Sequence, residues 1–278
     1  MVRTAFWAGM LSLPLLCGGL FGWFAPQRDD LTILDVGQGD CAVLRHAGAT
    51  ILIDDGPAKR TDPRGPPAVM SALRRIGVDD VDLILLSHPD ADHVGGTGAL
   101  LRQFPHVTVA ISGYYASQPK LLRDLREWGL KPEAVLWLPQ MCRLRVSGST
   151  LTIVCPPVSD AQNDNLGSMC VRWQDEGATA DFTGDAPSEV ENQLVGAGNW
   201  RADILHVGHH GSRHSTGLEW IRAVHPQVAV ISCGRDNPYG HPHRATLDRL
   251  AASHVPVLRT DQQGDLVFVP ISGHFQHR

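Results

Sequence analysis

Two histidines and two aspartates stand within six residues, directly after a run of four aliphatic residues. The segment is Ser87-His88-Pro89-Asp90-Ala91-Asp92-His93-Val94-Gly95-Gly96, and Leu83-Ile84-Leu85-Leu86 precedes it. Side chains alternate along an extended chain, so His88, Asp90 and Asp92 share one side and His93 follows where the chain turns. Burying unpaired ionised groups is costly, and a divalent cation removes that cost. The pattern therefore predicts a metal site at the end of a strand, in preference to a solvated loop.

Short runs rich in β-branched and aliphatic residues, bounded by Gly, Pro, Asn or Asp, predict strands. The expected strands cover residues 31–36, 41–45, 50–53, 83–87, 107–111, 151–154, 169–173, 178–182, 204–207, 228–232, 256–258 and 266–269. Helical periodicity is expected over residues 67–76, 119–128, 188–194, 217–224 and 246–252. Early strands follow one another through tight turns, and later strands alternate with helices. This order predicts one α/β domain over residues 29–278, with sheet packed on sheet and helices outside.

An uncharged apolar stretch covers residues 5–25, which is close to the roughly 20 residues that a membrane-spanning helix needs. We expect residues 1–28 to form a single anchor helix in the cell membrane. A cleaved signal peptide and a buried helix are the alternatives, although the bulky Trp23-Phe24 pair disfavours a cleavage site. One arginine flanks each end, Arg3 and Arg28, so the side of the membrane stays open, with an extracytoplasmic domain favoured.

Net charge, cysteine spacing and histidine content limit the kinds of substrate and site that are expected. A net charge of −5 gives no global positive field for nucleic acid, so a polyanionic substrate would need local arginines or metal ions. The six cysteines include no Cys-x-x-Cys pair, which predicts small buried side chains in place of a disulfide framework or a thiolate zinc site. Seven of the 14 histidines lie between His206 and His243, and this concentration needs a functional explanation.

Five further polar segments are spread along the chain in a fixed order. They are Leu34-Asp35-Val36-Gly37-Gln38-Gly39-Asp40, Ile51-Leu52-Ile53-Asp54-Asp55-Gly56-Pro57, Phe182-Thr183-Gly184-Asp185, Val207-Gly208-His209-His210-Gly211-Ser212 and Asn237-Pro238-Tyr239-Gly240-His241-Pro242. With residues 87–96 they resemble the metallo-β-lactamase superfamily, whose signature is His-x-His/Asp-x-Asp-His after a strand. Within it, they resemble the C-terminal hydrolase domain of ComEC-type DNA-uptake proteins. The resemblance implies a four-layer αββα sandwich.

The resemblance also implies a site for two divalent metal ions. The ligands that it implies are His88, Asp90, Asp92, His93, Asp185 and His209. The first two would bind one metal, the next two the other, and Asp185 would bridge the pair. We prefer His209 to His210 as the last ligand because it lies nearer the end of its strand. Catalytic roles then fall to Asp92 and to His210, which would contact substrate or bound water.

Five more residues are candidates for contacting substrate or orienting a ligand: Asp40, Asp54, Asn165, Ser212 and His241. Ligating imidazoles usually donate their second N–H to a carboxylate, which Asp54 could supply, while a turn role is equally open for Asp40. Asn165 stands where the family has its middle histidine. His241 has a substrate-facing role or a turn role. Because carboxylates replace imidazoles, the site would admit manganese as readily as zinc.

The resemblance implies hydrolysis by a metal-activated hydroxide, and the favoured activity is that of a phosphodiesterase or nuclease acting on single-stranded DNA during uptake. Cationic side chains that would hold the DNA backbone are Lys120, Arg123, Arg126, Arg213, Arg235 and Arg244. The channel of ComEC-type proteins lies outside these 278 residues, so we expect a detached domain with a separate membrane channel protein or a part of a longer chain. The alternatives are a hydrolase of a small ester, lactone or phosphodiester, and a non-catalytic metal-bound module that docks a membrane partner.

Overall fold

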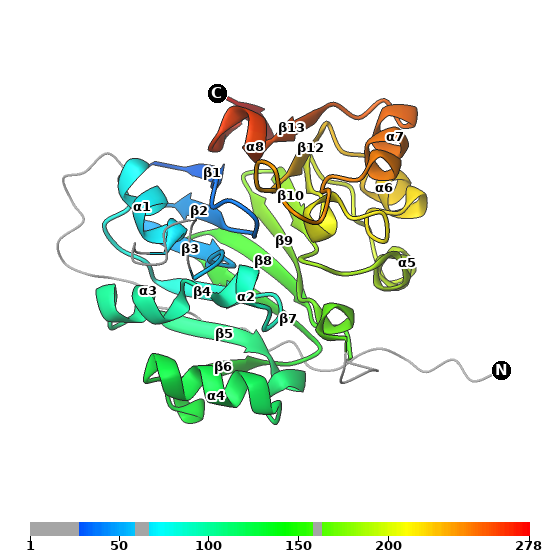
Figure 1. Ribbon diagram of the computed structural model, residues 1–278. Helices are drawn as coiled ribbons and strands as arrows, with labels where there is room; N and C mark the ends of the chain where they lie inside the picture. The colour runs from blue at the N-terminus through cyan, green and yellow to red at the C-terminus, as the bar shows by residue number, and fades with distance from the viewer. Residues whose placement is uncertain (1–27, 59–66, 158–162) are drawn as a thin grey trace.

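The computed structural model of the chain describes residues 28–58, 67–157 and 163–278. The predicted anchor over residues 5–25 lies outside these ranges. Within them, every helix is too short or too polar to cross a membrane. The described residues form two sheets with helices on their outer faces (Figure 1).

The first sheet has eight strands in the order β15-β14-β1-β2-β3-β4-β5-β6. Their bounds are β1 Asp30–Ile33, β2 Ala42–His46, β3 Ala49–Ile53, β4 Leu83–Leu86, β5 Thr108–Ser112, β6 Val135–Leu138, β14 Leu266–Ile271 and β15 His274–His277. The strands from β3 to β6 are parallel, and the other pairs are antiparallel. β4 is aliphatic and buried at every position, as expected for a parallel strand that is covered on both faces.

The second sheet has seven strands in the order β13-β12-β11-β10-β9-β8-β7. Their bounds are β7 Met141–Val146, β8 Ser149–Val154, β9 Cys170–Asp175, β10 Ala178–Phe182, β11 Ile204–His206, β12 Val228–Ile231 and β13 Val257–Arg259. The strands from β7 to β10 are antiparallel, and those from β10 to β13 are parallel. Exposed and buried residues alternate along β7, so this strand turns only one face to the core.

The helices form the two outer layers (Figure 1). Those on the first sheet are α1 Ala68–Arg75, α3 Thr97–Gln103 and α4 Pro119–Trp128, and those on the second are α5 Ser188–Val195, α6 Leu218–Val224 and α7 Arg244–Ala252. The shorter elements are α2 Ala91–Val94, α8 Thr260–Gln263, η1 Gly113–Tyr115, η2 Pro132–Ala134, η3 Asp164–Gly167 and η4 Gly208–Gly211. The layers therefore run helix, sheet, sheet, helix, as the sequence predicts.

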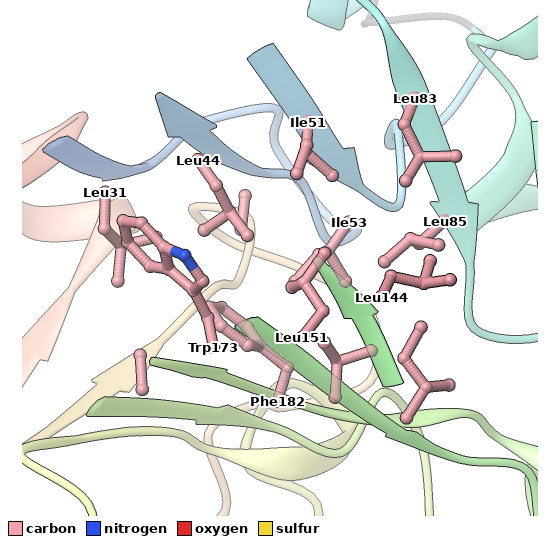
Figure 2. Close-up of a cluster of buried hydrophobic side chains, with 14 of the residues drawn as sticks. Leu31, Leu44, Ile51, Ile53, Leu83, Leu85, Leu144, Leu151, Trp173 and Phe182 are labelled. Atoms are coloured by element: carbon pink, nitrogen blue, oxygen red, sulfur yellow. The ribbon is translucent and has the colours of Figure 1, made fainter. Parts of the chain in front are cut away.

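The main hydrophobic core lies between the two sheets (Figure 2). Leu44 and Leu85 of the first sheet and Leu151, Trp173 and Phe182 of the second are all at most 2% exposed. Removal of this apolar surface from water is the dominant favourable contribution to folding. The core holds the two sheets together and so fixes the edge at which their strands end.

Candidate metal centre

The predicted metal ligands come together where β4, β10 and β11 end. Four of them follow β4 through α2, Asp185 follows β10, and His209 and His210 lie in η4 after β11. A backbone hydrogen bond of 2.9 Å, from the N–H of Met169 to the carbonyl of Ser87, joins the segment before β9 to the end of β4. Both sheets therefore deliver polar side chains to one shared edge.

The buried carboxylate of Asp185 lies at the centre of this group. Its Oδ1 is 3.2 Å from Nε2 of His93 and 3.8 Å from Nε2 of His210. Its Oδ2 is 3.4 Å from Nε2 of His209 and 3.8 Å from Nε2 of His88. One oxygen faces each pair of imidazoles, so Asp185 divides the site into two positions, and its bridging of two metals stays a prediction.

The inner position is formed by Asp92, His93 and His210. Their ligand atoms all lie within 4.8 Å of one another, and Oδ2 of Asp92 is 3.3 Å from Nε2 of His210. Both imidazoles are buried. Burial lowers the pKa of His93, but Asp185 and Asp54 raise it well above its ordinary value. Positive charge is therefore favoured at the inner position.

The outer position is formed by His88, Asp90 and His209 and is more open to solvent. Oδ2 of Asp90 is 3.5 Å from Nε2 of His88, while its Oδ1 is 2.6 Å from the ammonium group of Lys120. The contact with His88, and then Lys120, hold the pKa of Asp90 below its ordinary value. The ring of His209 adjoins Asn165, with 3.4 Å between Nδ1 and the amide nitrogen. Asp90 therefore offers one oxygen to a metal, and Lys120 engages the other.

The donor atoms fit divalent cations. Nε2 of His88, His93 and His210 and Oδ1 of Asp185 are buried and have no hydrogen-bond partner. Such orphaned polar atoms are costly unless a ligand satisfies them. Ligands about 2.1 Å from a tetrahedral metal stand roughly 3.4 Å apart, and the separations around Asp185 are 3.2 to 3.8 Å. The residues are therefore spaced as a metal centre requires.

Asp54 orients two of the imidazoles. Its Oδ2 is 2.8 Å from Nδ1 of His93 and accepts a 2.8 Å hydrogen bond from the hydroxyl of Ser87. That hydroxyl oxygen lies 2.9 Å from Nδ1 of His88 and so accepts the proton of that ring. With Nδ1 of each ring engaged in this way, Nε2 is the nitrogen that faces the centre. The sequence predicts this role for Asp54 but not the relay through Ser87.

Asp40 performs the same task for His210. Nδ1 of His210 lies 3.0 Å from Oδ1 of Asp40 and 3.1 Å from the carbonyl of Ser232. The carbonyl of Ser232 accepts the Nδ1 proton, the Asp40 carboxylate lies beside it, and Nε2 is left to the centre. Burial alone would raise the pKa of Asp40, but His206 and His210 lower it to about 2. His206, which the sequence does not single out, is buried 3.8 Å from Asp40.

The turn role considered for Asp40 is also present. The N–H of Asp40 donates a 3.2 Å hydrogen bond to the carbonyl of Asp92. The preceding Gly39 has φ 148°, and a Cβ there would stand 2.4 Å from the same carbonyl oxygen. Only glycine allows this approach. The turn after β1 thus supports the backbone of a predicted ligand.

His209 and His210 both adopt left-handed backbone conformations, with φ of 51° and 53°. This conformation is uncommon for residues with a side chain, and here it kinks the chain after β11. The turn points the two rings to different oxygens of Asp185, and His210 faces Asp92 and His93. The geometry therefore favours His210 as the inner ligand, whereas the sequence favoured His209. Both role assignments remain predictions.

The remaining two candidates differ in position. Ser212 is buried in the turn, where its N–H donates to the carbonyl of His209 and its own carbonyl accepts from the Thr246 hydroxyl. It supports the turn and contacts no donor atom of the centre among the described residues. The ring of His241 lies 5.5 Å from that of His209 and 6.0 Å from that of His210. His241 therefore stands beside the centre.

The fold and this centre define a metallo-β-lactamase fold protein. The family model of the metallo-beta-lactamase superfamily matches residues 34–235, and the chain belongs to that superfamily. It is related to competence proteins at about 30% identity over most of its length. ComE operon protein 3 of Bacillus subtilis is 30% identical over 259 residues, which cover 87% of this chain and 33% of that protein. Competence protein ComA of Neisseria gonorrhoeae is 32% identical over 240 residues, which cover 86% and 32%.

The chain spans about a third of the length of these curated relatives. Among solved structures, the metallo-beta-lactamase fold protein YhfI from Bacillus subtilis superposes with a TM-score of 0.57 at 15% identity. The match covers 86% of this chain and 99% of YhfI. At that identity the likeness shows the fold alone.

Proposed function

We propose that the chain is a metal-dependent phosphodiesterase that hydrolyses single-stranded DNA during DNA uptake. The observation that carries the proposal is the convergence of orphaned, buried donor atoms on both oxygens of Asp185. The relatedness to competence proteins supports DNA as the substrate. Two divalent metal ions, zinc or manganese, would occupy the inner and outer positions.

A bound pair of divalent metals polarises a phosphoryl group and lowers the pKa of water enough for hydrolysis at neutral pH. The protein's own part is to keep the donor set in place. Asp54 holds the Nδ1 proton of His93, and the Ser232 carbonyl, with Asp40 beside it, holds that of His210, so Nε2 of each ring faces the centre. Asp185 contributes one oxygen to each position. The ligands are thus arranged before substrate arrives, and little reorganisation is needed during reaction.

The outer position would be the side on which substrate enters. Two side chains of the outer position, Asp90 and His209, are 37% and 29% exposed, whereas at the inner position only Asp92, at 32%, is exposed to a similar degree. Lys120 lies at this side through its contact with Asp90, and Arg213 lies beside His243. These cations offer local positive charge to a phosphate backbone although the chain as a whole is acidic.

The proposal includes a membrane anchor at the N-terminus of the chain. Residues 5–25 would anchor the chain in the cell membrane, with the hydrolase domain on the extracytoplasmic side. A separate membrane channel protein would then receive the DNA strand. A protease-protection assay on intact cells tests the sidedness, because an extracytoplasmic domain is cleaved by added protease and a cytoplasmic one is protected.

The activity is tested with the purified full chain and added Mn²⁺ or Zn²⁺. The substrates are a single-stranded oligonucleotide, bis-p-nitrophenyl phosphate and p-nitrophenyl acetate, and an Asp92→Ala preparation controls for contaminating nuclease. Metal-dependent cleavage of the oligonucleotide, lost in the Asp92→Ala chain, supports the proposal. Cleavage of the small substrates alone indicates the small-ester or small-diester alternative. No cleavage of any substrate by a metal-loaded chain supports the non-catalytic module.

A further inference from the structure

An exposed aromatic ring stands next to the centre without a part in holding it. The side chain is Tyr239, in the loop after β12, and the residue is 61% exposed. Its ring stacks on that of His241, with 5.7 Å between centroids and 25° between planes. His241 in turn lies 5.5 Å from His209 and 6.0 Å from His210, measured between ring centroids. We call Tyr239 and His241 together the aromatic ledge.

The loop that carries the ledge is held firmly. The side-chain amide of Asn237 donates to the carbonyls of Gly234 and His241, at 2.9 Å and 2.6 Å. The carbonyl oxygen of the same side chain accepts from the N–H of His241 at 2.9 Å. A single exposed aromatic is ordinary on a protein surface. Here the hydrogen bonds of Asn237 hold the loop, and the ring stacks on a histidine that lies beside the metal centre.

The ledge is also joined to the turn that carries His209 and His210. The N–H of His243 donates a 2.9 Å hydrogen bond to the carbonyl of Gly211. A Cβ on Gly211 would stand 2.5 Å from Cβ of Pro242, so the two segments are in close contact. The ledge therefore keeps a fixed position relative to the catalytic histidines.

A cation adjoins the ledge. Nη2 of the exposed Arg213 lies 3.1 Å from Nε2 of His243, and the ring of His243 is 4.8 Å from that of His241. Aromatic faces alternating with cations form the surface on which proteins hold single-stranded nucleic acids. The aromatic face accepts any base, and the cation contacts phosphate.

We propose that Tyr239 and His241 form a stacking subsite for a nucleobase of a single-stranded nucleic acid, a short distance along the strand from the phosphodiester at the metal centre. The inference rests on the proposed phosphodiesterase function and specifies how its substrate is recognised. Arg213 contacts the strand's phosphate beside the stacked base. A flat base then lies on the outer face of Tyr239, and the strand passes over His241 towards the outer position.

The test compares KM for two oligonucleotides of equal length with the metal-loaded full chain. One carries bases throughout, and the other carries abasic sites and so lacks stacking surfaces. The measured quantity is the ratio of KM for the abasic strand to KM for the base-containing strand. The test variants are Tyr239→Leu and Tyr239→Phe. The control is Ile271→Ala, at an exposed apolar position in β14, and circular dichroism verifies the folding of each variant.

Loss of one stacked base costs about 5- to 100-fold in affinity. We expect this ratio to be high in the natural chain, to fall by about that factor in Tyr239→Leu, and to be retained in Tyr239→Phe and Ile271→Ala. A ratio in Tyr239→Leu equal to that of the natural chain overturns the ledge alone. A natural chain that cleaves neither oligonucleotide overturns the proposed function together with the ledge, so the two failures are distinguishable.

Discussion

Oδ2 of Asp54 lies 2.8 Å from Nδ1 of His93, and the same oxygen accepts the hydroxyl proton of Ser87, which holds the ring of His88. One buried carboxylate thus fixes the orientation of an imidazole at each of the two positions.

The Asp54→Asn chain should bind metal about 10- to 100-fold more weakly, because an amide holds the Nδ1 proton less strongly than a carboxylate does. Isothermal titration of the metal-free chain with Zn²⁺ measures the change. Asp80→Asn, at an exposed carboxylate that pairs with His106, serves as the control and should bind as the natural chain does. Equal affinity in the two variants would show that Asp54 has no orienting role.

The number of metal ions that each variant retains distinguishes the roles of His209 and His210. His210→Gln should lose the metal of the inner position, because His210 faces Asp92 and His93. His209→Gln should retain that metal and weaken only the outer position. Metal content by mass spectrometry after dialysis against a weak chelator decides between them. The opposite pattern would favour His209 as the inner ligand, as the sequence alone suggested.

Lys120 should weaken metal binding at the outer position, since its ammonium group engages Asp90 and repels a cation. In Lys120→Met we expect the second metal equivalent to bind roughly fivefold more tightly, the effect of about 1 kcal/mol for a partly exposed ion pair. Titration of the metal-free chain resolves the two equivalents. Lys131→Met, at another exposed lysine, is the control. An unchanged or weaker second equivalent in Lys120→Met contradicts this role.

Metal affinity should increase with pH. Burial lowers the pKa of His210, but Asp40 and Asp185 raise it well above its ordinary value, and Asp185 and Asp54 do the same for His93. Below these raised pKa values each ring carries a proton that a metal must displace, so binding releases protons and tightens as pH rises. Calorimetry between about pH 6 and pH 8, in buffers of different ionisation enthalpy, measures the release. A pH-independent affinity without proton release would refute the prediction.

The elements that the sequence predicts best are those with clear local signals. β10 and α4 occupy the predicted residues, and α4 has Pro119 at its start and Gly129, with φ 75°, at its end. Three strands were not predicted: β6, β7 and β15. In β7 the outward positions include Arg143 and Arg145, so its apolar content is low. β15 is a mostly exposed edge strand. The five described cysteines are buried and unbonded, as predicted.

In the candidate site, too, only the features with a local sequence signal could be predicted. The donors of residues 88–93 were predictable because they are adjacent in sequence. The role of Ser87, and the pairing of Lys120 with a ligand 30 residues earlier, arise from the folded chain. No local pattern records which ring of a His-His pair faces a given carboxylate, because that depends on the backbone of η4. The family resemblance identified the candidate ligands, and the structure shows how their side chains are arranged around Asp185.

Anomalous diffraction at the manganese edge, from crystals of the full chain grown with Mn²⁺, locates any metal bound at the two positions. We predict a peak about 2.2 Å from Nε2 of both His93 and His210, with Asp185 in contact, and a weaker peak near His88. A fully ordered centre with no anomalous peak, or peaks only at distant surface carboxylates, would contradict it.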